Sequence, residues 1–148
     1  MTMRGEKIYE CDFDVTGATD YGITLDAILS GKERIPPQGA RVDVAYAGPI
    51  KGRVTGSVRG VDYLRIRADG RIDLDTRATI ETSDGHRIGL SADGVGAPRA
   101  GEPIADLFEN VRFITAAADY VWVHTRQTWG VGQVNFATGK IHIEGYQQ

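Results

Sequence analysis

The segment Asp119–Thr128 carries side chains suited to binding a small molecule. Read as a strand, it places Tyr120, Trp122, His124 and Arg126 on one face, because successive side chains of a strand point to opposite sides. That face combines two aromatic rings, an imidazole that titrates near neutral pH and a permanent cation. Turned into a barrel, it would form a ligand pocket with apolar walls and a few polar groups. Turned outward, it would be solvated, with Trp122 half covered.

A second polar face follows the strand predicted at residues 71–83. Asp75 and Arg77 lie two residues apart, roughly 6–7 Å between their Cα atoms, so they can form an ion pair or together bind a polar ligand. The opposite face of this strand is apolar. An outward, solvated position is therefore slightly favoured for Asp75 and Arg77. Asp62 begins the preceding strand, where it either accepts backbone N–H bonds in a turn or serves as an acid or base.

Motifs for metals, cofactors and covalent catalysis are weak. His86, His124 and His142 stand in separate segments without ligand spacing, so no metal site is expected. The glycine pairs at 94–96 and 130–132 precede no helix that could hold a phosphate, and no cofactor is expected. Cys11 has no partner for nucleophilic catalysis that the sequence can identify.

The elements that position these residues are mostly strands. Asp69-Gly70, Asp84-Gly85 and Thr138-Gly139 each separate two alternating runs, and such pairs favour hairpins in which both central residues have positive φ. Other strands are expected near residues 7–15, 21–29, 41–47, 51–58, 111–116 and 119–128, and one short helix near 102–109. Together these predict an all-β domain over residues 1–148, a single antiparallel closed or nearly closed lipocalin-like barrel of about nine or ten strands.

Composition narrows the class of partner. The chain has 148 residues, a net charge of −3 and one cysteine. An acidic balance offers nothing to neutralise phosphates, so nucleic acid is not an expected partner. No apolar run reaches the roughly 20 residues that span a bilayer, so no membrane association is expected. A lone cysteine is typical of a reducing compartment, which predicts a cytoplasmic protein.

The ordered motifs resemble the DUF3237 (UPF0311) family of small uncharacterised proteins. They comprise Gly60-Val61-Asp62-Tyr63, then Arg67-Ala68-Asp69-Gly70, Asp75-Thr76-Arg77, Tyr120-Val121-Trp122-Val123-His124 and Trp129-Gly130-Val131-Gly132. The resemblance covers roughly residues 34–146 and implies a lipocalin-like antiparallel barrel. Members of that family often have an aromatic residue where this chain has Ala78, and usually asparagine where it has His124. The resemblance says almost nothing about a reaction, because a fold does not settle a function.

Three functions remain open at this point. The first is a barrel that binds a small apolar or aromatic organic molecule, with Tyr120 and Trp122 as walls and Asp62, Asp75, Arg77 and Arg126 at its polar end. The second is a cofactor-independent isomerase, cyclase or lyase, with His124 or Asp75 as general acid or base. Both need Tyr120, Trp122, His124 and Arg77 to converge on one cavity. The third is a structural homo-oligomer that buries apolar strand faces between subunits.

Overall fold

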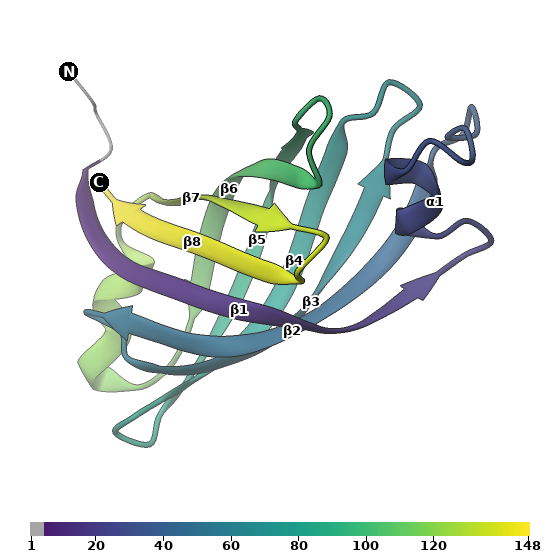
Figure 1. Cartoon of the computed structure of the whole chain (residues 1–148). Coiled ribbons are helices and arrows are strands. Elements are labelled where there is room, and N and C mark those ends of the chain that lie inside the picture. The colour runs from purple at the N-terminus through teal and green to yellow at the C-terminus, as the bar shows by residue number, and fades with distance from the viewer. Residues whose placement is uncertain (1–4) are drawn as a thin grey trace.

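The chain folds into a closed antiparallel barrel. The computed structural model describes residues 5–148, which form eight strands in sequential order around the barrel (Figure 1). The first strand pairs with both the second and the last, and this double pairing closes the sheet. The predicted all-β antiparallel barrel is confirmed, with eight strands rather than nine or ten. The strands are β1 (Glu6–Asp20), β2 (Ala40–Gly52), β3 (Gly56–Ile66), β4 (Ile72–Thr82), β5 (Arg87–Pro98), β6 (Ile104–Ile114), β7 (Thr128–Asn135) and β8 (Lys140–Gln147).

The three predicted hairpin turns are confirmed, but their backbone differs from the expected one. Gly70 and Gly85 have φ of 94° and 90°. Their N–H groups donate hydrogen bonds to the carbonyl oxygens of Arg67 and Thr82, at 2.9 and 3.0 Å. Among the residues described, every positive φ belongs to a glycine. The turns are therefore not of the type that needs two left-handed residues. A single left-handed glycine suffices to reverse the chain.

The helix expected near residues 102–109 is wrong, because that segment belongs to β6. Ala105, Leu107, Val111 and Phe113 are buried on the inner face of this strand. Glu109 occupies the inward position between them, since side chains alternate along a strand. The segment resembled a helix because Ile104, Leu107 and Phe108 are spaced for one helical face, but on β6 Leu107 is buried and Phe108 is 52% exposed.

The strands expected near 119–128 and 21–29 are also wrong. A 3-10 helix, η1 (Ala118–His124), connects β6 to β7. A short helix, α1 (Leu25–Leu29), follows β1, and the hydroxyl of its N-cap Thr24 accepts a hydrogen bond from Ala27 N at 3.0 Å. The two helices lie at opposite ends of the barrel (Figure 1). We call the end at η1 the closed end and the end at α1 the mouth.

Two apolar clusters fill the barrel interior. One lies at the closed end and includes Ile50, Val54 and Val123 of η1. The other lies towards the mouth and includes Ile66 and Ile72, with Leu25 and Ile28 of the α1 region packed against it. No helix within residues 5–148 is long and apolar enough to cross a lipid bilayer. The inner face between the clusters carries the polar side chains of the site.

Candidate ligand-binding site in the barrel interior

Four polar side chains share an interior cavity of about 50 Å³. Tyr46, Asp62, Thr76 and Glu109 come from β2, β3, β4 and β6, and ten apolar or aromatic residues complete the wall. A cavity needs roughly 10–15 Å³ on this measure to hold one water molecule. The interior therefore has room for a polar head group or a few waters, whereas a larger ligand must extend towards the mouth.

Asp62 is held by the backbone of the neighbouring strand. Its Oδ1 accepts a hydrogen bond from Asp75 N at 3.1 Å. Burial raises the pKa of the Asp62 carboxyl to about 6; the hydrogen bond from Asp75 N opposes this rise, and the negative charge of Asp75 adds to it. Asp62 is thus mostly ionised at neutral pH and takes up a proton in mildly acidic solution.

Glu109 is the most perturbed carboxyl of the site. Burial, reinforced by the negative charge of Asp62, raises the pKa of Glu109 to about 8. Its carboxyl has no hydrogen-bond partner within residues 5–148. Glu109 is therefore mainly protonated at neutral pH, beside an Asp62 that is mainly ionised. Groups with pKa values displaced in this way concentrate at functional sites.

The other two polar groups bond to each other. The Tyr46 hydroxyl and Thr76 Oγ1 form a short hydrogen bond, and Thr76 Oγ1 also lies 3.3 Å from Val61 O. Burial raises the pKa of Tyr46 above its usual value. The Tyr46 ring packs against Phe13 with centroids 4.9 Å apart. These contacts make an aromatic wall beside the two carboxyls.

A larger hollow of about 590 Å³ opens at the mouth, and we call it the vestibule. Leu25 and Ile28 of the α1 region contribute apolar surface to it, as does Ile35. Ile72 and Phe136 line both the vestibule and the interior cavity. These two side chains lie between the vestibule and the interior cavity that holds the carboxyls.

The expected convergence of Tyr120, Trp122, His124 and Arg77 on one cavity is wrong. The Tyr120 hydroxyl donates to Asp84 Oδ1 at 2.8 Å, and the Arg53 guanidinium lies 3.9 Å from the centroid of the Trp122 ring. These aromatic side chains belong to η1, which must cross from β6 to β7, so their alternation reflects a helix at the closed end.

The remaining residues from that segment also lie away from the cavity. His124 Nε2 accepts from Thr115 N at 3.1 Å, and its Nδ1 lies 3.1 Å from Val121 O. Both ring nitrogens are thus occupied by backbone groups, which leaves His124 no free nitrogen for proton transfer. Arg126 lies 4.0 Å from Glu6 in an exposed ion pair.

Asp75 and Arg77 lie on the outer face of the barrel. Both are exposed, whereas Thr76, which lies between them, and Leu74, which precedes Asp75, are buried. The slightly favoured outward position is the one observed. Among the candidates chosen from the sequence, Asp62 lines the interior cavity and the other six do not. Binding roles for those six residues stay predictions, because the six do not line this cavity together.

Sequence reasoning missed Glu109. The signal was present: Ala105, Leu107, Val111 and Phe113 are spaced at two-residue intervals, and Glu109 completes that series. A carboxyl in the middle of an inward apolar series is a polar residue at a core position.

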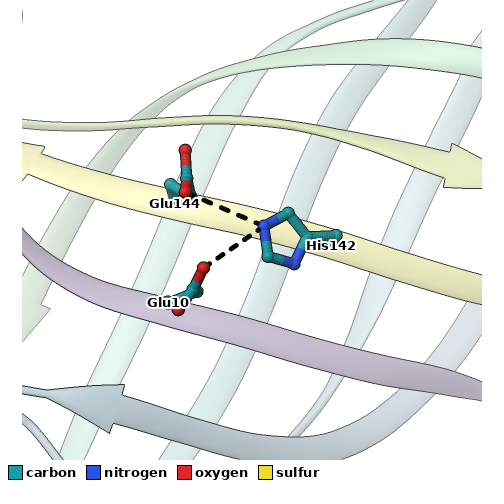
Figure 2. Close-up of side chains that lie close together, drawn as sticks. All are labelled: Glu10, His142 and Glu144. Atoms are coloured by element: carbon teal, nitrogen blue, oxygen red, sulfur yellow. Dashed lines mark ion pairs between the residues drawn. The ribbon is translucent and has the colours of Figure 1, made fainter.

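A separate cluster on the outer face of β1 and β8 joins Glu10, His142 and Glu144 (Figure 2). His142 Nε2 lies 3.7 Å from Glu10 Oε1 and 3.9 Å from Glu144 Oε1. Lys7 Nζ lies 2.9 Å from Glu144 Oε1 and 3.4 Å from Glu10 Oε1. Lys51 Nζ lies 3.6 Å from Glu10 Oε2, so two ammonium groups already balance the two carboxylates, and the cluster is an ion-pair network of the surface.

Comparisons with known proteins place this barrel in a family. It resembles solved structures of a protein of unknown function from Clostridium acetobutylicum (TM-score 0.78, 18% identity, 96% of this chain and 94% of that one) and a β-barrel-like protein from Acinetobacter baumannii (TM-score 0.77, 18% identity, 96% and 93%). It also resembles a protein described as an enzyme from Penicillium herquei (TM-score 0.65, 20% identity, 97% and 92%). A search of curated proteins finds no match. The model of a family described as a protein of unknown function, DUF3237, matches residues 18–148, and the chain therefore belongs to that family.

Proposed function

We propose that the chain binds a small, largely apolar organic molecule, with its apolar part in the vestibule and its polar group against Asp62 and Glu109. The observation that carries this proposal is Glu109, a half-buried carboxyl that lines the interior cavity without a hydrogen-bond partner in the part of the chain described. A ligand that bonds to this carboxyl would supply a hydrogen bond that no group of the described barrel provides.

The adjacency of the two spaces supports the same proposal. The interior cavity alone is too small for a drug-sized molecule, but it shares the lining residues Ile72 and Phe136 with the vestibule of about 590 Å³. Apolar walls with a few polar groups at one end are typical of small-molecule sites.

Binding of the uncharged fluorophore N-phenyl-1-naphthylamine tests the proposal. We expect saturable fluorescence enhancement that weakens by about tenfold or more, or roughly 1.4 kcal/mol, in Ile28→Glu, which places a charge in the vestibule. Ile114→Glu is the matched control, because Ile114 is 75% exposed on the outside of the barrel. Equal binding by the wild type and both variants, or no binding by the wild type, would overturn the proposal.

A second candidate function is proton transfer without a cofactor, as in an isomerase, cyclase or lyase. The favouring observation is the unequal pair of carboxyls, with pKa values of about 6 for Asp62 and about 8 for Glu109. Between these values Asp62 can accept a proton while Glu109 can donate one. One similar structure is described as an enzyme, which agrees with this candidate.

The proton-transfer candidate makes a separate demand on the two carboxyls. For any substrate that the barrel converts, we expect activity to be greatest between about pH 6 and about pH 8 and to fall on both sides. Asp62→Asn and Glu109→Gln should each reduce turnover by about a hundredfold or more, while substrate affinity changes less. Full turnover in either variant would exclude that carboxyl from the reaction.

A further inference from the structure

The charges around the cavity identify a class of ligand, and this inference rests on the binding function proposed above. Asp62 and Glu109 line the cavity, while the residues described there include no lysine, arginine or histidine. We infer that the polar group bound by this barrel is a cation, and specifically the ammonium group of a primary amine whose apolar remainder occupies the vestibule.

The hydrogen-bonding needs of the cavity agree with an ammonium head group. Asp62 Oδ1 already accepts from Asp75 N, and Glu109 has no partner among the residues described. An ammonium group has three N–H donors and no acceptor. Bound between the carboxyls, it could donate to Glu109 and to the remaining oxygen of Asp62. The proton that Glu109 holds in the empty barrel would then return to solvent.

The aromatic wall favours the same charge. Phe13 and Tyr46 line the cavity beside the carboxyls, and their rings pack at 4.9 Å. The face of an aromatic ring carries negative potential and attracts a cation, more strongly when the cation is desolvated. An anionic head group would meet this face and the negative charge of Asp62, with no cationic side chain among the described lining residues to balance that charge.

The route from solvent is acidic as well. The vestibule is lined by Asp26 and Glu102, while its one arginine among the described lining residues, Arg99, is bound to Asp106 at 2.7 and 3.1 Å. This bidentate pair neutralises the cation. The charged side chains that line the vestibule therefore sum to −1, from Asp26, Glu102 and Arg99, a balance that favours cations over anions there.

Three ligands that share a benzyl group test the inference on the intact chain. Benzylamine, benzyl alcohol and phenylacetate differ in whether the head group is positive, neutral or negative near neutral pH. Titration calorimetry should give benzylamine the highest affinity, by about tenfold over benzyl alcohol, and no measurable binding of phenylacetate. Tighter binding of benzyl alcohol or phenylacetate than of benzylamine would overturn the inference.

Variants show whether the amine meets the interior carboxyls. Glu109→Gln should weaken benzylamine about tenfold and leave benzyl alcohol within about twofold. Glu144→Gln makes the same substitution on the outer face and should leave both affinities unchanged. An equal change of benzylamine affinity in the two variants, including no change in either, would overturn the inference.

N-phenyl-1-naphthylamine separates this inference from the function on which it rests. If that fluorophore binds the wild type while benzylamine does not, the amine inference fails and the binding function stands. If none of the probes binds the wild type, both fail. Retained fluorophore binding by Glu109→Gln also shows that the variant is folded, so that lost benzylamine binding is assigned to the missing carboxylate.

Discussion

Replacing Glu109 by glutamine should stabilise the protein by an amount that grows with pH. The pKa of Glu109 is raised from 4.5 to about 8 on folding. Between these values the folded chain holds a proton that the unfolded chain has released, so the stability of the wild type falls as pH rises. The slope is roughly 1.4 kcal/mol per pH unit, which accumulates to about 3 kcal/mol by pH 7.

Glutamine keeps the shape of the protonated acid and cannot ionise, so Glu109→Gln lacks this loss. Urea unfolding of the wild type and the variant should give similar free energies near pH 4. At pH 7 the variant should be more stable by about 3 kcal/mol, and the difference should level off above the folded-state pKa of Glu109. The control is Glu144→Gln, because ion pairing with Lys7 lowers the pKa of Glu144. That control should lose stability at neutral pH, a change of opposite sign. A difference between the wild type and Glu109→Gln that does not vary with pH would refute the reasoning.

Three further predictions concern groups around the site and at the closed end. Asp62→Asn should lower the pKa of Glu109, because the charge of Asp62 raises it; ¹³C NMR titration of the Glu109 carboxyl measures this, and an unchanged value would contradict the coupling. Cys11 is 3% exposed, and burial raises the pKa of its thiol. The thiol of the folded protein should therefore not react with the disulfide reagent dithiobis(nitrobenzoate) until urea unfolds the chain. Rapid labelling of the native chain would show that this part of the barrel opens. Val123→Ala should lower the free energy of unfolding by about 1–3 kcal/mol. Val121→Ala, at a position that is 49% exposed, should change it by less than about 0.5 kcal/mol. Equal effects of the two variants in urea unfolding would show that packing of Val123 does not stabilise the core.

Most of the barrel was predictable because its hairpins are local. Asp69-Gly70 and Asp84-Gly85 each lie between alternating runs, and the chain reverses at both. The errors fell where distant parts of the chain decide the structure. Residues 119–128 alternate convincingly, but most of this segment connects β6 to β7 at the closed end and forms η1 there instead of a strand. Val123 then packs in the core as part of η1, a contact that no local pattern contains.

The sequence predicted part of the site for a related reason. Asp62 stood out because it follows Gly60 at a predicted strand start, although it lies in the middle of β3. Glu109 was hidden in a segment that resembled a helix. Whether a carboxyl on a strand meets solvent or a cavity depends on the register of all eight strands. The expected homo-oligomer depended on the same choice of faces: the apolar face of β4 points inward, so association between copies stays a prediction without that support.

The position of Glu109 itself argues that the barrel is built for more than stability. A leucine or valine there would continue the apolar series of Leu107 and Val111 and would avoid desolvating a carboxyl. The chain instead places Glu109 in the same cavity as Asp62, whose negative charge makes ionisation of Glu109 more costly. Natural sequences depart from consistent packing mainly at functional sites. The proposed binding of a ligand would account for the free energy lost at Glu109, because the ligand would bond to this unpaired carboxyl.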